Sequence, residues 1–187
     1  MDDTELTALL EANHASGFGW ALACCGRDPG EAEEVLQTVY LKILEGKARF
    51  RGDAAFRTWL FALIRNTAAD RRRRRLVRDL LALRFAQQER ARPDAFEHPE
   101  EGVSRGEARR AFLRALGLLP ARQRETLELV FYHDMTVEEA AAVMRITVGA
   151  ARQHYERGKR RLRQAFEESE SSYVSEWRRR QHSGEVS

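Results

Sequence analysis

The stretch that decides the fold runs from residue 50 to residue 75 and reads FRGDAAFRTWLFALIRNTAADRRRRR. Apolar and small side chains recur in it every three or four residues, which predicts the buried stripe of an amphipathic helix: Phe56, Trp59, Leu60, Leu63, Ile64, Thr67 and Ala68. Five other side chains of this segment lie outside that stripe: Arg57, Phe61, Arg65, Asn66 and Asp70. The helix then runs into five consecutive arginines, Arg71, Arg72, Arg73, Arg74 and Arg75. Their guanidinium groups point to every side of a helix and suit phosphate oxygens.

A run of arginines can also be a solvated face or a disordered tail. The helix in front of this run contains Trp59 as an apolar anchor, which places the arginines on a rigid platform. This context favours a binding surface over a tail.

Charge is distributed unevenly along the 187 residues, although the net charge is only +3. Residues 1–48 carry a net charge of −6, residues 49–92 carry +9, and residues 93–187 carry 0. A basic middle behind an acidic front indicates a polyanionic partner that binds one surface.

Composition narrows the class of protein. A length of 187 residues fits one medium domain or two small ones, and 43% hydrophobic residues suffice for thin helical cores. The two cysteines, Cys24 and Cys25, are adjacent in the apolar run 20–25, where we interpret them as small core residues with reduced thiols. No Cys/His spacing indicates zinc, so we expect no metal and no cofactor. The short apolar run and the acidic start of the chain predict a cytoplasmic protein without membrane insertion or a signal peptide.

The periodicity predicts helices throughout and no strand, an all-α fold. The expected helices span 4–26, 31–46 and 54–75, with the third continuing towards Phe85. Residues 92–106 contain two prolines, two glycines and four acids, which indicates a linker. We therefore predict two small helical domains, residues 1–91 and 107–168, joined by this acidic linker. The polar tail, residues 169–187, is expected to be frayed or disordered.

Residues 136–166 have the pattern of a helix-turn-helix. Thr136 and Glu139 form a capping box at the start of its first helix, and residues 146–149 form a tight turn with an apolar plug. In the second helix the expected inward side chains are Ala151, Tyr155, Gly158, Leu162, Ala165 and Phe166. The expected outward side chains are Arg152, Gln153, Glu156, Arg157, Lys159, Arg160 and Arg163.

In such motifs the second helix enters the major groove of DNA, and residues near its start touch base edges. Arg152, Gln153 and Glu156 are the candidates for base contacts, and Arg157 could contact a base or a phosphate. Lys159 and Arg160 lie further along, where phosphates are in reach. The alternative is an ordinary helical hairpin with a charged outer face.

Both segments resemble one family. Phe50-Arg51-Gly52, the 56–60 segment, Arg65-Asn66, Asp70 and the basic run are similar to domain 2 of the extracytoplasmic-function sigma factors of bacterial RNA polymerase. Similarity to domain 4 of the same family rests on these residues and the basic helix that follows them: Leu119-Pro120, Arg124, Thr136, Glu139, Ala141, Ile146 and Gly149. The two matches occur in the family's order, with no room for a folded domain 3 between them.

This resemblance implies which surfaces bind which partner. The −10 element would be melted and held by Phe50, Arg51, Gly52, Arg65, Asn66 and the five arginines 71–75, with a flipped base captured by the 50–52 loop and Asn66. The −35 element would be read by Arg152, Gln153, Glu156, Arg157, Lys159 and Arg160. Core polymerase would be bound, through its β′ clamp helices, by Glu34, Gln37, Thr38 and Leu41. The resemblance also implies contact with the β flap of the polymerase, promoter DNA and an anti-sigma factor as partners, and action at the nucleoid.

Interpretations without a role in binding stay open for several of these residues. Phe50 could be a buried loop anchor, and Gln37 a plain exposed helix residue. The acids of the linker could mimic nascent RNA in the polymerase cleft or only keep a tether in solution. Ala150-Ala151, His154 and Tyr155 depart from the residues usual in the family, so individual base contacts do not transfer directly.

Two other functions fit the residues less well. A one-component regulator would use the C-terminal helix-turn-helix, with residues 1–90 as a sensor or dimerisation domain, but it leaves the arginines of 49–84 unexplained. An enzyme is not indicated, because the sequence contains no paired catalytic carboxylates in context, no Ser/His/Asp set and no phosphate-binding loop.

Overall fold

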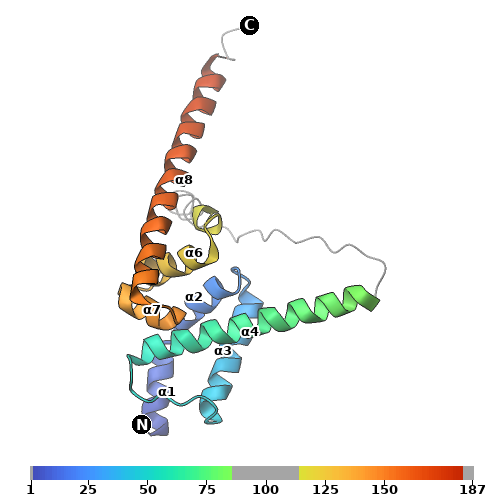
Figure 1. The fold of residues 1–187 in the computed structure, drawn as a ribbon, viewed down its shortest axis with the longest axis vertical. Coiled ribbons are helices and arrows are strands. Elements are labelled where there is room, and N and C mark those ends of the chain that lie inside the picture. The colour runs from blue at the N-terminus through green and yellow to red at the C-terminus, as the bar shows by residue number, and fades with distance from the viewer. Residues whose placement is uncertain (1, 86–113, 183–187) are drawn as a thin grey trace.

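The structure is a computed structural model that describes residues 2–85 and 114–182. All regular elements in these two ranges are helical, which confirms the all-α prediction (Figure 1). The N-terminal module contains α1 (Asp3–Ala12), α2 (His14–Cys24), α3 (Pro29–Leu44) and α4 (Phe56–Phe85). The C-terminal module contains a helical turn at 114–117, α6 (Ala121–Leu127), the π-helix η1 (Glu128–Tyr132), α7 (Val137–Met144) and α8 (Val148–His182). The predicted linker, residues 92–106, lies outside the described residues.

The first helix is shorter than expected. The sequence predicted one helix over 4–26, but the chain leaves helical geometry at Asn13, where α1 ends and α2 begins. The Asn13 side chain donates a hydrogen bond of 2.8 Å to the Leu9 carbonyl, and the hydroxyl of Ser16 donates to the Asn13 carbonyl at 3.1 Å. Such local bonds from short polar side chains compete with the helix backbone, which accounts for the break.

The polar C-terminal tail is more helical than expected. Helix α8 continues to His182, so most of the segment predicted to be frayed has helical backbone. No glycine or proline occurs between residues 159 and 182, and therefore nothing in the local sequence stops the helix.

Helices α3 and α4 form the framework of the N-terminal module. At the start of α3, the Asp28 side chain accepts a hydrogen bond from the Glu31 amide at 3.0 Å, and Pro29 occupies the first turn. The inner face of α3 buries Val35, Leu36, Val39 and Ile43. This face packs on the predicted stripe of α4, of which Leu60, Ile64 and Thr67 are almost completely buried.

Phe61 was expected to fall off that stripe, and this expectation is wrong. Its side chain is 0% exposed, its ring stacks on Trp20 at 5.9 Å, and its carbonyl accepts a hydrogen bond from the Trp20 indole at 3.0 Å. The edge of His133, from the C-terminal module, meets the Phe61 ring at 4.9 Å between centroids. Phe61 is buried because the second module covers this side of α4.

The two modules are packed together rather than held apart. The larger apolar cluster takes its buried side chains from the N-terminal helices and also from Leu129, Met135, Ala140, Val143 and Met144 of the C-terminal module. A second, smaller cluster lies within the C-terminal module: Ala115, Leu116, Leu119, Leu127 and Leu162. In Figure 1, α7 lies beside the first half of α4, whereas the second half of α4 projects away from the packed helices.

Candidate nucleic-acid interface

The helix-turn-helix is built as its sequence indicates. The Thr136 hydroxyl accepts a hydrogen bond from the Glu139 amide at 3.1 Å, and the Glu139 carboxylate accepts one from the Thr136 amide at 2.8 Å, so the predicted capping box is confirmed. Arg145 ends α7 with a φ of 54° in the left-handed region. Ile146 packs against the larger apolar cluster, which confirms it as an apolar plug. The turn is shorter than the predicted 146–149, because α8 already begins at Val148.

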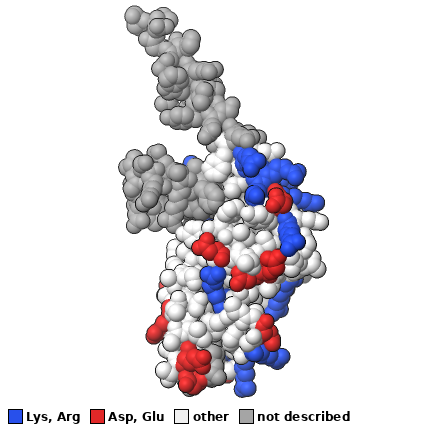
Figure 2. Space-filling model, turned by 90° about the vertical axis from the view of Figure 1, so that its left-hand side faces the viewer, with Lys and Arg blue, Asp and Glu red and all other residues white. Residues whose placement is uncertain are grey.

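Helix α8 presents its faces as predicted. Ala151 is 0% exposed, and Gly158 lies so close to Leu127 that a Cβ atom added there would be 3.0 Å from a Leu127 methyl carbon. The close approach of α6 fixes which side of α8 faces the solvent. The predicted outward residues are exposed apart from the half-buried Lys159: Arg152, Gln153, Glu156, Arg157, Arg160 and Arg163. Figure 2 shows basic side chains running along one edge of the face of the molecule it displays, densest beside the upper part of the described chain.

Some of these outward cations already have acidic neighbours. Arg152 donates to Glu138 of α7 at 2.8 Å, a contact that lowers the pKa of the Glu138 carboxyl. Lys159 lies 3.9 Å from Glu156 and 5.0 Å above the centre of the Tyr155 ring. Within the described ranges, Arg157 and Arg160 have no carboxylate partner. Exposed ion pairs of this type contribute little free energy, so phosphate groups can replace the carboxylates.

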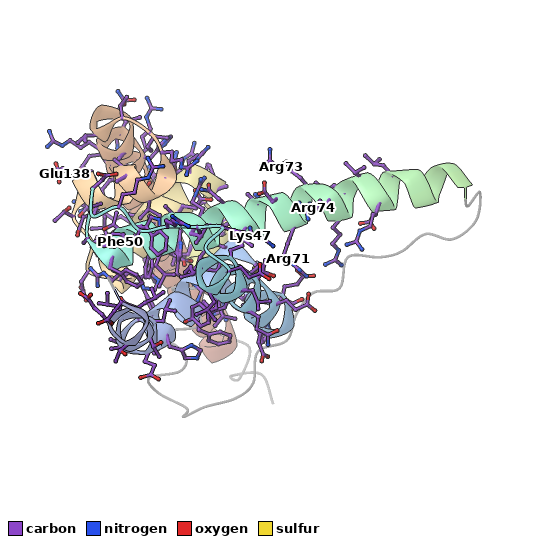
Figure 3. All side chains as sticks on the ribbon, turned by 90° about the horizontal axis from the view of Figure 1, so that it is seen from below. Lys47, Phe50, Arg71, Arg73, Arg74 and Glu138 are labelled. Carbon is purple, nitrogen blue, oxygen red and sulfur yellow. The ribbon has the colours of Figure 1, made fainter. Side chains whose placement is uncertain are left out.

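The five arginines of α4 differ in their surroundings (Figure 3). Arg71 lies against α3, where it forms ion pairs with Glu34 and with Glu31, and Arg75 reaches Glu31 at 3.4 Å. Arg73 pairs with Asp70 at 2.6 Å on the helix surface. Arg72 and Arg74 are exposed, and the described part of the chain offers them no ion pair. Three of the five arginines, Arg71, Arg73 and Arg75, therefore already pair with carboxylates, and Arg71 also holds α4 on α3.

The loop before α4 combines an anchored ring with an exposed backbone. Phe50 is half-buried, and its ring centre lies 5.3 Å from that of Phe56 and 5.4 Å from that of Trp59. The interpretation of Phe50 as a loop anchor therefore matches its contacts. Arg51 is exposed, and Gly52 has a φ of +81°, a conformation that side chains with a Cβ rarely adopt.

Arg65 and Asn66 lie side by side in sequence but in different settings. The Arg65 guanidinium donates two hydrogen bonds, of 3.1 and 3.0 Å, to the Glu125 carboxylate of the C-terminal module. The Arg65 side chain is only 14% exposed. Asn66 is half-buried, with no side-chain hydrogen bond within the described ranges. The structure thus brings Arg65 to the second module and leaves Asn66 accessible.

The outer side of α3 combines polar and apolar side chains. Leu41 is 57% exposed and Leu44 is 65% exposed, and their spacing of three residues places them on one side of α3. Gln37 is exposed and donates to Glu33 at 3.3 Å, whereas the Thr38 hydroxyl is turned to the Glu34 carbonyl at 2.7 Å. An exposed apolar pair beside polar groups is typical of a protein-binding surface.

Sequence reasoning missed the joint between the modules. Arg27, in the left-handed region with a φ of 72°, reaches across to Glu128 at 2.7 Å. Glu128 is 4% exposed, and burial raises the pKa of its carboxyl while the Arg27 guanidinium opposes that rise. His133 packs at a steep angle against the stacked rings of Trp20 and Phe61, and burial lowers its pKa to about 4. In each of these contacts the two residues lie more than 70 positions apart in the sequence, so no local pattern identifies the contact.

Comparisons with known proteins match both modules to the same family. The Sigma-70 region 2 model matches residues 9–76, and the Sigma-70, region 4 model matches residues 109–162. The RNA polymerase sigma factor CarQ of Myxococcus xanthus is 32% identical over 161 residues, which cover 86% of this chain and 89% of that protein. The RNA polymerase sigma-H factor of Pseudomonas aeruginosa is 31% identical, with 75% of each chain covered.

The chain belongs to the extracytoplasmic-function sigma factors of the sigma-70 family. A solved structure of the sigma factor RpoE of Bartonella quintana, in complex with the anti-sigma factor NepR, has the same fold with a TM-score of 0.66 at 20% identity, and covers 87% of this chain and 97% of that one. The structure of CnrH in complex with the cytosolic domain of CnrY gives a TM-score of 0.60 at 22% identity, with 88% of this chain and 90% of that chain covered.

As a sigma factor, the protein directs promoter-specific initiation of transcription by RNA polymerase. The alternative of a one-component regulator is not favoured, because the residues that it would assign to a sensor domain match sigma region 2.

Two kinds of feature are absent from the described ranges of this sigma factor. No helix of residues 2–85 or 114–182 is long and apolar enough to span a bilayer. The same residues contain no cluster of three or more His, Cys, Asp or Glu side chains that could hold a metal ion.

Proposed function

We propose that residues 1–91 of this sigma factor bind core polymerase and the −10 element, and that residues 107–168 bind the −35 element as duplex DNA. Residues 92–106 connect the two, and residues 169–187 extend the second. The observation that carries the proposal is the exposed, basic outer face of α8, whose inner face packs on α6 and α7. This arrangement presents a helix of the right length and charge to the major groove.

Contact with the polymerase is assigned to the outer side of α3, through Glu34, Gln37, Thr38 and Leu41. The 57% exposure of Leu41 supports the assignment, because burial of this apolar side chain in an interface would stabilise the complex. Glu34 also pairs with Arg71, so polymerase binding and the position of the α4 arginines are coupled through this acid. The partners would be the β′ clamp helices here and the β flap at the C-terminal module.

Strand opening is assigned to the 50–52 loop, Asn66 and the arginines of α4. Asn66 has the accessibility and the free amide that recognition of an unpaired base requires. Phe50 orients the loop through its contacts with Phe56 and Trp59, while Arg51 and the backbone at Gly52 face outwards. Arg72 and Arg74 are the arginines best placed for phosphates, since neither has an ion pair within the described ranges.

Recognition of the −35 element is assigned to Arg152, Gln153, Glu156, Arg157, Lys159 and Arg160. The first three lie in the N-terminal part of α8, where base edges are in reach, and the last two would contact phosphates. Arg152 would exchange its ion pair with Glu138 for a DNA acceptor.

The packed arrangement of the two modules is not the promoter-bound one in this proposal. Arg65 cannot donate to the Glu125 carboxylate and to a DNA phosphate with the same N–H groups. Promoter binding at both elements therefore requires that the modules separate at the joint formed by Arg27, Arg65 and His133.

The protein has no catalytic activity of its own in this proposal, and it acts on DNA in the cytoplasm, at the nucleoid. One solved structure of the same fold contains a sigma factor with an anti-sigma factor, and another contains CnrH with the cytosolic domain of CnrY. An anti-sigma factor is proposed as a partner of this chain too.

Run-off transcription tests the assignment. Purified protein is mixed with core polymerase and a library of promoter templates, and transcript starts are sequenced. Starts at a fixed spacing from a shared bipartite motif are expected. Asn66→Ala should impair strand opening, measured by permanganate reactivity of unpaired thymines, more than duplex binding. Arg152→Ala should instead weaken binding of −35 duplex. Equal loss of both functions in both variants would contradict the division of labour between the modules.

A further inference from the structure

A cavity of about 940 Å³ lies where the end of α2, the start of α3 and the middle of α4 meet α6 of the second module. Its lining includes Cys24 and Cys25 at the end of α2, Glu31 and Val35 of α3, arginines of α4, and Arg124 of α6. The volume falls within the range of roughly 300–1,000 Å³ that is typical of small-molecule sites. The contacts with DNA and polymerase proposed above use neither Arg78 nor Arg124, so they leave this cavity unexplained.

One side of α4 supplies the guanidinium groups of the cavity. Ala68 is 6% exposed and belongs to the larger apolar cluster, so its side of α4 faces the packed helices. Helical spacing places on the same side the lining arginines that follow it by three, four, seven and ten residues: Arg71, Arg72, Arg75 and Arg78. Figure 3 shows Arg71 directed towards α3 and Arg73 at the opposite edge of α4.

Positive charge is in excess on this side of the cavity. Glu31 is the one acid among the described residues of the lining, and it is shared by Arg71 and Arg75. Three lining arginines have no carboxylate within ion-pair distance in the described ranges: Arg72, Arg78 and Arg124. Cations gathered in one cavity repel one another, and an anionic ligand would relieve that repulsion.

A hydrogen-bond donor at the cavity also lacks a partner. The Nε atom of Arg71 is buried and makes no hydrogen bond in the described part of the chain, and a Glu31 carboxylate oxygen lies 3.6 Å from it. Buried donors of this kind are normally paired, so an acceptor that the chain does not supply is expected here. Burial raises the pKa of the Cys25 thiol to about 11, and the charges of Arg71 and Arg72 oppose that rise. Both guanidinium groups therefore lie near the neutral thiol.

We propose that the cavity between the arginines of α4 and Arg124 of α6 binds a small anion that carries a chain of linked phosphate groups. From Arg71 to Arg78 an α-helix rises about 10 Å, and Arg124 adds a guanidinium from the second module. A single phosphate would contact one or two of these groups, whereas a phosphate chain reaches several and offers each one bidentate acceptors. Val35 and the thiols form a wall without charge, which suits the base of a nucleotide.

The ligand would bridge the two modules. The arginines of α4 belong to the first module and Arg124 to the second, so contact with both requires the packed arrangement. Arg124 is the neighbour in α6 of Glu125, whose carboxylate accepts from Arg65 across the joint. A ligand that binds only the packed arrangement stabilises it by mass action.

An unpaired DNA strand offers the same phosphate groups, but it explains less of the cavity. A strand bound along the exposed side of α4 needs Arg72 and Arg74 and gains nothing from a guanidinium of the second module. Arg124 is therefore the residue whose removal separates a compact ligand from DNA, and the test is built on it.

The experiment is an isothermal titration of the full chain with inorganic tripolyphosphate, at about 0.15 M salt and without divalent cations. We expect one tripolyphosphate per chain, bound about tenfold more tightly than sulfate at equal ionic strength. Arg78→Ala and Arg124→Ala should each lose about tenfold in affinity for tripolyphosphate. Arg163→Ala removes the same charge from an exposed position of α8 outside the cavity, and as the matched control it should lose less than about twofold. Arg124→Ala should leave the affinity for a single-stranded DNA oligonucleotide within about twofold of the parent's.

Adenosine triphosphate serves as a second probe and distinguishes the two sources of a phosphate chain. Tighter binding than that of tripolyphosphate would assign the wall of Val35 and the thiols to a base, and the ligand would be a nucleotide. Equal binding would assign the cavity to the phosphate chain alone, as in inorganic polyphosphate.

Hydrogen exchange measures the bridging. Saturating tripolyphosphate should slow exchange at the amides of η1, which lies in the joint, about threefold in the parent and leave it unchanged in Arg124→Ala. Slower exchange in α4 alone would show that the first module holds the ligand by itself and would overturn the bridge.

Three titration results would overturn the site. Equal binding of sulfate and tripolyphosphate would show an adventitious ion only. Unchanged tripolyphosphate affinity in Arg78→Ala and Arg124→Ala would place the ligand elsewhere. A DNA oligonucleotide that loses as much affinity as tripolyphosphate in Arg124→Ala would assign the cavity to nucleic acid. None of these measurements involves polymerase or a promoter, so they fail or succeed independently of the proposed function.

Discussion

Lowering the pH from about 7.5 to 5 should lower the free energy of unfolding by about 2 kcal/mol through His133 alone. His133 is 6% exposed and packs against the stacked rings of Trp20 and Phe61, within the joint. Burial lowers its pKa from 6.5 to about 4, with the charges of Arg57 and Arg27 acting in the same direction and that of Asp134 opposing them.

The sign follows from which state binds the proton more tightly. In the unfolded chain His133 has the ordinary pKa of 6.5, whereas in the packed state burial lowers its pKa to about 4. Its full contribution is therefore present above pH 6.5 and is lost as the pH falls towards 4. The complete loss amounts to about 3 kcal/mol, at about 1.4 kcal/mol for each tenfold change in the proton-binding constant, and roughly 2 kcal/mol of it is lost by pH 5. Glu128 acts in the opposite sense, because its pKa is raised and protonation relieves its burial.

The measurement is the free energy of urea unfolding at several pH values between 4.5 and 7.5, followed by circular dichroism and tryptophan fluorescence. His133→Gln removes the titrating group and should flatten the pH dependence over this range by about 2 kcal/mol relative to the parent, whatever its own cost in stability. His14→Gln, at an exposed histidine outside the joint that contacts the ring and the hydroxyl of Tyr40, serves as the matched control and should keep the parent's slope. An identical slope in the parent and in His133→Gln would refute the reasoning, and so would a flattened slope in His14→Gln.

Three further outcomes are expected. Gly158→Ala should lower the free energy of unfolding by about 1–3 kcal/mol in a urea titration, because the added methyl group meets Leu127 at 3.0 Å. The control Gly117→Ala adds a methyl group in open space and should cost far less. Equal costs would contradict the close α6–α8 contact. Glu125→Gln should raise the affinity for a single-stranded −10 oligonucleotide several-fold, measured by anisotropy, since it removes the negative charge that holds the Arg65 guanidinium. Unchanged affinity would argue against Arg65 as a DNA contact. Arg160→Ala should reduce the slope of log affinity against log salt concentration for −35 duplex by about 0.9, and an unchanged slope would exclude a phosphate contact there.

Elements with a strong local signal were predictable from the sequence. Helix α4 was expected from its repeating apolar stripe, and α7 from the capping box of Thr136 and Glu139. The inward face of α8 followed from Ala151, Gly158 and Leu162, all of which are buried. In each case a few neighbouring residues determine the geometry, so the order of residues along the chain was sufficient.

Features that depend on distant residues were not predictable in the same way. The break at Asn13 depends on weak local hydrogen bonds that many helices tolerate. The pairing of Arg71 with Glu31 and Glu34 depends on how α3 lies along α4. A guanidinium that suits phosphate suits a carboxylate equally well, and the sequence alone does not say which one it meets.

The second face of α4 shows why the joint between the modules escaped prediction. Arg57, Phe61 and Arg65 are spaced four residues apart, and in the structure they meet Asp134, His133 and Glu125 of the C-terminal module in turn. A phenylalanine at the centre of an otherwise polar stripe was the available signal, because its burial requires a second packing partner. A helix with apolar residues on two faces packs on two sides, and here the second side is the one to which the −10 contact of Arg65 is assigned. Residues of this stripe can therefore hold the modules together or bind DNA, but Arg65 cannot do both at once. The strength of the joint then sets how readily the proposed DNA-binding surface is exposed.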